Sequence, residues 1–264
     1  MVESLERGDN MSDWNSAQYL KFEKERTQPA ADLLSRVSDF SPEKILDAGC
    51  GPGNSTALLA NRFGTEKVLG IDASNDMLKK ARKKHPDIHF EKAFLPDGIS
   101  EFGEFDLIFS NACIHWIPDH QTLIPSLFSH LSEGGRLAVQ IPYKRKSVFY
   151  GLLFSLLDKK WKKLKEIRLF NELTPEEYYD ILSSLSADFS IWESEYYHTV
   201  NSFDDIIGWY SGSGLRPYYD VLSPEEKEEF VSDLKKLISE NFKIQQNGKI
   251  ILKMPRLFFT VTKD

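Results

Sequence analysis

The chain has 264 residues, 41% of them hydrophobic, and carries a formal net charge of −7. This length predicts one large domain or a core with an inserted cap, and the acidic balance argues against a nucleic-acid partner, which requires a basic face. The sequence has no run of about 18 apolar residues that would predict a membrane span and no secretory signal. Cys50 and Cys113 suit a reducing compartment and are too few to form a metal cluster, so we expect a cytoplasmic protein without a metal site.

Residues 1–40 predict an N-terminal helical segment. Tyr19, Phe22, Leu33 and Leu34 have helical spacing, and Pro29 predicts a break between helices.

Residues 41–142 alternate between two patterns. Strand-like runs occupy residues 44–49, 67–72, 88–93, 105–112 and 135–142. Helix-like runs occupy residues 55–63, 75–85 and 122–132. Strands separated by helices of this length form βαβ units, so the predicted fold class is α/β with a parallel sheet.

Residues 143–264 are expected to supply helical cap elements and the last strands of the sheet. Thr174 with Glu177, and Ser223 with Glu226, form capping boxes that predict two helix starts. Helix-like runs occupy residues 174–185, 202–214 and 223–242, and strand-like runs occupy residues 189–200 and 248–264.

A glycine-rich turn, "DAGCGPGNST", follows the first predicted strand. Its spacing is G-x-G-x-G, and Asn54 stands where the dinucleotide fingerprint G-x-G-x-x-G has its third glycine. The turn also lacks the lysine of a phosphate-binding P-loop. Asp47 precedes the turn, and Asp72 ends the second strand, where a carboxylate can accept both ribose hydroxyls of a nucleoside.

The D-x-G-x-G-x-G pattern resembles that of class I methyltransferases, which use S-adenosylmethionine. The resemblance implies a Rossmann-like sheet of seven strands, mostly parallel, with the last strand antiparallel. It also implies that the glycines let the backbone approach the cofactor closely. Many such enzymes have an acidic residue where this chain has Phe94, so Ala93 is the candidate for a backbone contact with the adenine. The cofactor-binding residues that it implies are Asp47, Gly49, Cys50, Gly51, Asn54, Asp72, Ala73, Met77, Ala93, Asn111 and Trp116.

Longer strings resemble one narrower family, the trans-aconitate 2-methyltransferases. "DAGCGPGNSTALL", "LIFSNACIHWIPDH", "LAVQIP", "EYYHTV", "GLRP" and "NGKIILKMPRLF" occur in the same order there, and the resemblance extends from about Met11 to Leu257. It implies transfer of a methyl group from S-adenosylmethionine to one carboxylate of trans-aconitate. The products are a monomethyl ester and S-adenosylhomocysteine.

A carboxylate is ionised at neutral pH, so this reaction needs no general base, and we expect no catalytic residue beyond those that position the substrate. His115 and His120 are therefore interpreted as parts of the wall or of a helix start. Arginine pairs with carboxylates through two parallel hydrogen bonds, and tyrosine hydroxyls can add further ones. The substrate-binding candidates are Tyr19, Arg26, Tyr196, His198, Trp209, Arg216 and Arg256.

Three alternatives stay open at this point. The acceptor could be another small or carrier-bound carboxylic acid, because residues 158–168 are dense in basic side chains. The chain could bind the cofactor without catalysis. An NAD-dependent oxidoreductase would share Asp72 but would require a glycine in place of Asn54. The expected partner is a small polycarboxylate, with neither nucleic acid nor membrane involved.

Overall fold

The computed structural model describes residues 23–167 and 171–264, with side chains from Thr27 onwards. Residues 24–198 and 252–264 form one compact unit, and residues 199–251 belong to a second one.

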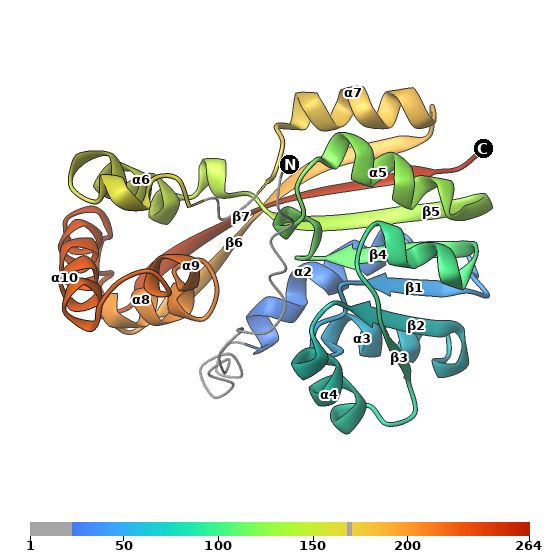
Figure 1. Ribbon diagram of the computed structural model, residues 1–264, viewed down its shortest axis with the longest axis horizontal. Helices are drawn as coiled ribbons and strands as arrows, with labels where there is room; N and C mark the ends of the chain where they lie inside the picture. The colour runs from blue at the N-terminus through green and yellow to red at the C-terminus, as the bar shows by residue number, and fades with distance from the viewer. Residues whose placement is uncertain (1–22, 168–170) are drawn as a thin grey trace, which may run out of the picture. The chain divides into compact units, whose positions relative to one another are not determined.

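A seven-stranded sheet in the order β3-β2-β1-β4-β5-β7-β6 forms the centre of the first unit (Figure 1). Its strands are β1 (Ile45–Ala48), β2 (Val68–Asp72), β3 (His89–Lys92), β4 (Phe105–Asn111), β5 (Leu131–Pro142), β6 (Phe189–Val200) and β7 (Ile250–Thr262). The first five strands pair in parallel, and β7 runs antiparallel to β5. The predicted α/β fold, its parallel core and the antiparallel last strand are confirmed.

Helices cover both faces of this sheet. They are α2 (Glu23–Ser35), α3 (Asn54–Phe63), α4 (Asn75–Lys84), α5 (His120–Ser129) and α7 (Pro175–Leu185). Helix α6 (Val148–Lys159) belongs to the same unit. One apolar cluster joins the sheet to α5 and α7, and another joins it to α2 and α3. Short 3-10 turns lie between them: η1 (Thr65–Lys67), η2 (Asp97–Phe102), η3 (Ile114–Trp116), η4 (Lys144–Lys146) and η5 (Lys162–Leu164).

The second unit is helical. It contains α8 (Phe203–Ser211), α9 (Arg216–Tyr219) and α10 (Pro224–Asn241). Tyr218 of α9 and Phe230 of α10 are fully buried, with ring centroids 6.1 Å apart. Lys235 of α10 donates to Asp204 of α8. Both predicted capping boxes are present, at the starts of α7 and α10.

Two sequence predictions were wrong at element boundaries. Helix α2 runs through Pro29 without a break, because Pro29 is buried and the turn after it packs Ala30 and Leu33 into the core. Helix α5 ends at Ser129, and Leu131, which the sequence pattern predicts to lie in that helix, begins β5. Leu131 is fully buried and pairs with Phe105 through an irregularity in the β4–β5 register. Between Phe105 and Leu107, the paired position on β5 moves from Leu131 to Arg136.

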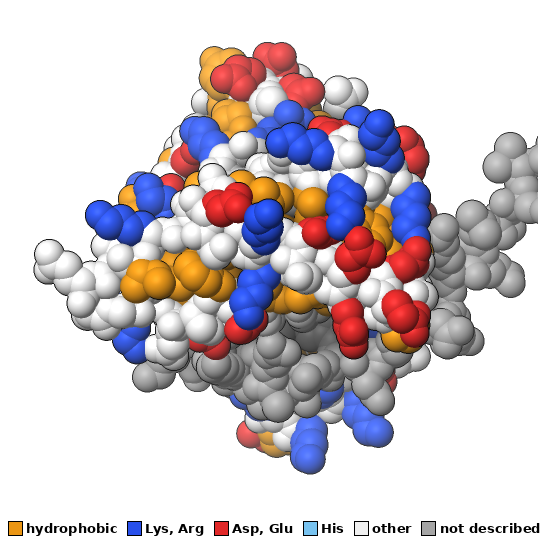
Figure 2. Space-filling model, turned by 90° about the vertical axis from the view of Figure 1, so that its left-hand side faces the viewer, with side chains coloured by type: hydrophobic (Ala, Val, Ile, Leu, Met, Phe, Trp, Pro, Cys, Tyr) orange, Lys and Arg blue, Asp and Glu red, His pale blue; other side chains and the backbone are white. Residues whose placement is uncertain are grey.

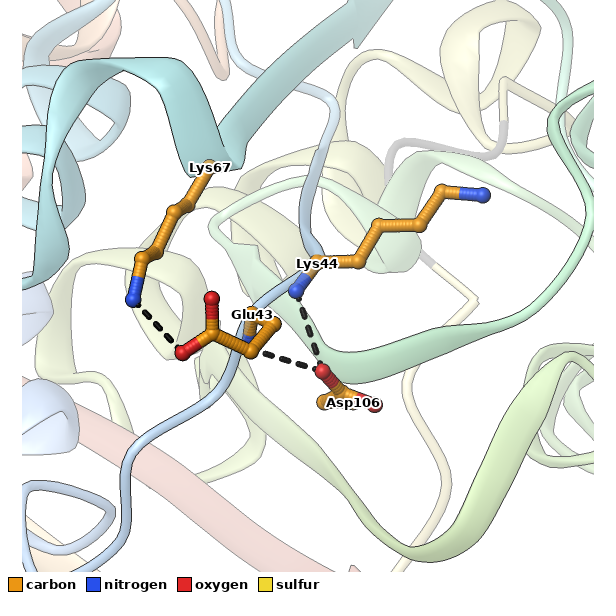
Figure 3. Close-up of polar contacts among 4 residues, drawn as sticks. All are labelled: Glu43, Lys44, Lys67 and Asp106. Carbon is orange, nitrogen blue, oxygen red and sulfur yellow. Dashed lines mark hydrogen bonds and ion pairs between the residues drawn. The ribbon is translucent and has the colours of Figure 1, made fainter.

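The carboxylate of Asp106 on β4 binds the backbone just before β1 (Figure 3). Asp106 Oδ2 accepts hydrogen bonds from the backbone nitrogens of Glu43 (2.8 Å) and Lys44 (3.0 Å), and Lys67 forms an ion pair with Glu43 at 2.8 Å. Ser132 donates to the other oxygen of Asp106 at 2.6 Å. Partial burial acts to raise the pKa of Asp106, but these hydrogen bonds hold it below its usual value. These contacts hold the starts of β1, β4 and β5 next to one another.

The surface in Figure 2 carries acidic and basic side chains interspersed with each other. In the described part of the chain, no helix combines the length and the apolar character that crossing a membrane requires. Within the same residues, no group of three or more His, Cys, Asp or Glu side chains could hold a metal ion.

Candidate active site

The strand order reverses its direction of growth between β1 and β4. From β1 the chain builds outward through β2 and β3, and then it returns to add β4 and β5 on the other side. In open α/β sheets, ligands bind at the carboxyl ends of the strands beside such a switch point. The glycine turn follows β1, and Asn111 is the last residue of β4. The predicted cofactor site therefore lies at the topologically favoured position.

The glycine turn requires glycine for two reasons. Gly49, Gly51 and Gly53 have φ values of 80°, 55° and 88°, in the left-handed region that disfavours side chains. A Cβ on Gly49 would lie 2.1 Å from Cys113 Sγ, so the loops after β1 and β4 pack against each other there. A Cβ on Gly51 would meet nothing within 4 Å. Gly51 thus presents its backbone to open space, as a ligand-binding turn must.

Asp72 holds this turn to the start of α4. Its Oδ2 accepts from the backbone nitrogen of Gly51 at 2.9 Å, and its Oδ1 accepts from Ser74 at 2.8 Å. Burial raises the pKa of Asp72, and the two N–H groups partly oppose this effect. Each carboxylate oxygen can accept more than one hydrogen bond, so Asp72 can serve the turn and still accept ribose hydroxyls.

Asp47 supports the turn from beneath and is fully buried. Its Oδ2 accepts hydrogen bonds from the hydroxyls of Ser55 and Thr56, both at 2.7 Å, and these residues form the first turn of α3. Burial raises the pKa of Asp47 to about 6. Its Oδ1 is buried and has no hydrogen-bond partner among the described residues. Asp47 therefore braces the turn, and its contact with a cofactor stays a prediction.

The side chains predicted to surround the adenosine differ in exposure. Ala93 is buried, and its nitrogen donates to the carbonyl of Asp72 at 3.3 Å. Phe94 is 62% exposed, and Lys92 Nζ lies 5.6 Å from its ring centre. Trp116 of η3 is 45% exposed. Phe94 and Trp116 are therefore accessible aromatic surfaces rather than parts of the core.

The remaining predicted cofactor contacts have other neighbours in the structure. Asn54 starts α3, and its Oδ1 accepts from Lys84 at 2.9 Å. Ala73 is exposed beside Asp72, and the Met77 nitrogen donates to the cap residue Ser74. These positions border the turn, and their contact with a cofactor stays a prediction.

Both thiols are held in their protonated form. Cys50 is buried in the turn, and Cys113 packs against Gly49. Burial raises the pKa of Cys113 to about 12 and also raises that of Cys50, with the Asp47 and Asp72 carboxylates adding to both shifts. A thiol in this state is a poor nucleophile, which favours a packing role for both.

Neither histidine near η3 is placed as a general base. His120 begins α5; its Nε2 donates to the Ile114 carbonyl at 2.9 Å, and its Nδ1 accepts from the Tyr178 hydroxyl at 2.7 Å. His115 is buried, and its pKa lies well below the usual value because of burial and the positive charges of Arg256 and Lys144. His115 is therefore neutral, and it lies close to two cations.

Three substrate-binding candidates lie on β6 and β7 in the first unit. Tyr196 donates to Asp32 of α2 at 2.5 Å, and its ring is stacked with that of His198 at a centroid distance of 6.5 Å. Tyr197, between them on the strand, is 59% exposed, so Tyr196 and His198 share the opposite face. Arg256 is partly buried on β7 and pairs with Pro142, the last residue of β5.

The other substrate-binding candidates are placed elsewhere or lie outside the described part. Trp209 is buried in α8, and Arg216 begins α9 with its Nε 4.0 Å from Asp220 Oδ2. Both belong to the second unit. Arg26 lies in α2, but its side chain is not described, and Tyr19 lies outside the described residues.

Sequence reasoning missed a buried ion pair. Lys144 Nζ of η4 lies 3.4 Å from Glu172 Oε2, and the Glu172 side chain is fully buried. Burial raises the pKa of Glu172, and Lys144 opposes that effect. The pair joins segments 28 positions apart that have no shared motif, so nothing in the sequence pattern indicated it. It also missed Gln140, whose signal was visible as a polar residue within the apolar string "LAVQIP".

A surface depression of about 310 Å³ between α5 and α7 is not this site. Its lining residues are Gln121, Pro125, Glu177, Asp180, Ile181 and Ser184. The two carboxylates there would repel an acidic substrate, and the glycine turn contributes no residue to it.

Comparison with known proteins agrees with this geometry. Residues 45–135 match the family described as "Methyltransferase domain". A trans-aconitate 2-methyltransferase from Afipia carboxidovorans is 39% identical over 257 residues, covering 96% of this chain and 100% of that protein. The protein of the same name from Escherichia coli O45:K1 is 40% identical over 254 residues, covering 96% and 99%.

Solved structures support the fold. A putative methyltransferase from Bacillus halodurans superposes with a TM-score of 0.58 at 16% identity, covering 89% of this chain and 99% of that one. The YcgJ protein from Bacillus subtilis gives 0.57 at 15% identity, covering 89% and 97%. Identity of about 39% over nearly the full length decides the family. The chain belongs to the trans-aconitate 2-methyltransferase family of S-adenosylmethionine-dependent enzymes.

Proposed function

We propose that this enzyme transfers the methyl group of S-adenosylmethionine to one carboxylate of trans-aconitate, forming a monomethyl ester. The observation that carries the proposal is the match of nearly the whole chain, cap helices and last strands included, to proteins of that name. A match restricted to the glycine turn would support only the use of the cofactor, which many activities share.

The residues of the turn fit this cofactor. Gly51 faces open space, and Asp72 has acceptor capacity at the end of β2. Asp47 has a buried oxygen without a hydrogen-bond partner in the described part of the chain. We therefore assign ribose binding to Asp72 and the amino-acid end of the cofactor to the turn. When bound, the cofactor supplies a methyl group activated by a positively charged sulfur.

The acceptor requires orientation rather than deprotonation. A carboxylate is already the nucleophile at neutral pH, and neutral His115 is not needed to remove a proton. Arg256 is proposed to hold one of the carboxylates that do not react, with Tyr196 and His198 beside it on β6. Arg26, Arg216, Trp209 and Tyr19 remain further candidates. Such positioning can supply roughly 7–11 kcal/mol of the barrier reduction.

The charge of this region favours a polyacid. Arg256 and Lys144 both lower the pKa of His115, so both lie near it. Glu172 balances the charge of Lys144 at 3.4 Å, so Arg256 supplies the positive potential beside the neutral imidazole. We propose that this potential attracts the tricarboxylate. That residues 143–264 supply a helical cap, and that the protein is cytoplasmic, remain parts of the same proposal.

The test is methyl transfer from labelled S-adenosylmethionine to trans-aconitate, with citrate, cis-aconitate and isocitrate in parallel. Release of labelled methanol by base identifies an ester. A clear preference for trans-aconitate is the expected result. If the enzyme binds S-adenosylhomocysteine but methylates none of these acids, the proposed substrate is wrong.

A second candidate acceptor is a carboxyl group on a carrier protein. Lys159 and Lys160 at the end of α6, followed by Lys162, Lys163 and Lys165, are all exposed. This cluster would suit an acidic carrier surface. A carrier-bound acceptor predicts that methyl transfer requires the carrier protein and falls when these lysines are changed to glutamine. Transfer to free trans-aconitate would be unaffected by the same changes.

A further inference from the structure

A row of polar side chains crosses one face of the sheet near the carboxyl ends of β4 and β5, where the middle of the antiparallel strand β7 lies beside the end of β5. Asn111 of β4 pairs in register with Gln140 of β5, and Arg256 of β7 pairs with Pro142, two residues further along β5. Side chains two residues apart on a strand share a face. The residues two positions away, Phe109, Ala138 and Phe258, all belong to the apolar cluster beneath α2 and α3. Asn111, Gln140 and Arg256 therefore project from this same face.

Gln140 is the unusual member of this row. It is 1% exposed, and its Nε2 has no hydrogen-bond partner among the described residues. Asn111 Oδ1, on the neighbouring strand, is likewise buried and without a partner in that part of the chain. Folded proteins pair nearly all such buried groups. An unpaired donor next to an unpaired acceptor, at the ligand-binding edge of an α/β sheet, indicates that ligand atoms complete both.

The two groups require partners of opposite kinds. An amide N–H donor such as Gln140 Nε2 binds an acceptor, and a carboxylate oxygen is the strongest one available. An amide oxygen such as Asn111 Oδ1 repels a carboxylate but accepts from an N–H donor. Asn111 is on β4, next to the β1 turn, whereas Gln140 is one strand further toward Arg256. The donor thus lies on the cationic side, where an acidic acceptor would be bound.

We propose that Gln140 is a substrate-positioning residue, whose Nε2 donates a hydrogen bond to a carboxylate oxygen of the methyl acceptor while Arg256 binds the same molecule. Asn111 accepts from the cofactor. This inference rests on the proposed carboxyl methyltransferase function. Gln140 fixes the orientation of the acid and so selects which oxygen reaches the methyl group. An acceptor without a carboxylate at that point would leave the donor unpaired.

The test compares Gln140→Leu with Gln140→Glu, and with Gln121→Leu as a matched control on the exposed surface of α5. The measured quantities are the KM and kcat for the acid, the Kd of S-adenosylhomocysteine and the unfolding midpoint. Loss of a hydrogen bond to a charged group should raise the KM of Gln140→Leu about 10- to 100-fold. The Kd of S-adenosylhomocysteine should change less than twofold. The unfolding midpoint should not fall, because a buried unpaired donor has been removed.

Gln140→Glu keeps the size of the side chain but replaces the amide with a carboxyl group, which donates a hydrogen bond only when it is protonated. Its KM for the acid should be higher than that of wild type at pH 8 and should fall as the pH is lowered, because only the protonated carboxyl donates. A purely structural role for Gln140 would not produce this pH profile. Gln121→Leu should match wild type throughout.

The failures can be told apart. If wild type methylates the acid and both Gln140 variants keep its KM, the positioning role is overturned while the proposed function stands. If Gln140→Leu raises the Kd of S-adenosylhomocysteine as much as it raises the KM for the acid, Gln140 belongs to the cofactor site and the inference is also overturned. If wild type methylates no polycarboxylate, the proposed function and the inference fall together.

Discussion

Replacing Asp47 with asparagine should make the stability of this protein less dependent on pH. Asp47 is fully buried beneath the glycine turn, with hydrogen bonds from Ser55 and Thr56 to one oxygen. Burial raises its pKa from 3.8 to about 6. Asparagine has the same shape and can still accept both hydrogen bonds, but it cannot ionise. The substitution therefore removes the pH-dependent part of the unfolding free energy that comes from ionising this buried carboxyl.

The sign follows from the direction of the shift. The folded pKa of Asp47 is higher than the unfolded one, so the folded state favours the protonated carboxyl. Its favourable contribution is fully present below about pH 4 and is lost as the pH rises through 6. A shift of about 2 units corresponds to about 3 kcal/mol. About 2 kcal/mol of this loss develops between pH 4.5 and pH 7.5.

The assay is urea unfolding of wild type and Asp47→Asn at several pH values across that range. The new amide N–H group has no partner where Oδ1 stood, so the variant carries a pH-independent cost of about 1–3 kcal/mol. The difference in unfolding free energy should still move in favour of the variant by about 2 kcal/mol as the pH rises. Asp106→Asn is the control: hydrogen bonds hold the pKa of Asp106 below its usual value, so its pH-dependent contribution is lost only at more acidic pH and the difference for this variant should be nearly constant across the range. A pH-independent difference for Asp47→Asn would refute the reasoning.

Three further outcomes follow from the site. Asp72→Ala should weaken S-adenosylhomocysteine binding at least tenfold by calorimetry, and unchanged affinity would remove its ribose role. Arg256→Ala should raise the KM for trans-aconitate about 10- to 100-fold with little effect on the cofactor, and an unchanged KM would remove its role in acid binding. Gly49→Ala should destabilise the protein by about 2–5 kcal/mol, because its φ is 80° and its new methyl group would meet a thiol at 2.1 Å. Gly151→Ala, at an exposed helical position with no atom within 4 Å of the new Cβ, should be neutral or stabilising in the same denaturation assay.

The parallel core could be predicted because each of its strands carries its own local signal. Apolar runs such as residues 105–112 are bounded by helical patterns of the right length, and that alternation permits few topologies. The end of α5 could not be predicted in the same way. Leu131 continues the apolar spacing of the helix, and only its pairing with Phe105 on a distant strand makes it the start of β5. Local patterns determine which elements form, whereas tertiary pairing determines where they end.

The residues of the candidate site also fall into those predicted by local spacing and those found only from tertiary contacts. Glycines at positions 49, 51 and 53 and the acid at the end of β2 are consecutive with their strands, so spacing alone predicted where they would lie. Asn111 was predicted from the sequence, but a role for Gln140 follows only from the register of β4 and β5, which places two side-chain groups without partners among the described residues on neighbouring strands. The Lys144–Glu172 pair likewise depends on a contact between distant segments. A pattern in one sequence identifies residues that act through the backbone, but it does not identify side chains that act through their neighbours.

The two acids of the turn predict that the enzyme binds S-adenosylmethionine more tightly than S-adenosylhomocysteine. Asp47 and Asp72 both have raised pKa values, and the charge of Asp72 contributes to the shift of Asp47. Two poorly solvated carboxylates close together favour binding of a cation. S-adenosylmethionine carries a positive charge on its sulfur, and this charge disappears when the methyl group is transferred. A charge interaction of roughly 1 kcal/mol, the scale expected in a partly solvated site, corresponds to about fivefold in affinity. Asp47→Asn should therefore reduce the ratio of S-adenosylmethionine to S-adenosylhomocysteine affinity about fivefold at pH 8. Because Asp47 is half protonated near pH 6, the reduction should become smaller below that pH. Equal weakening of both ligands at every pH would show that Asp47 acts on the turn by shape alone.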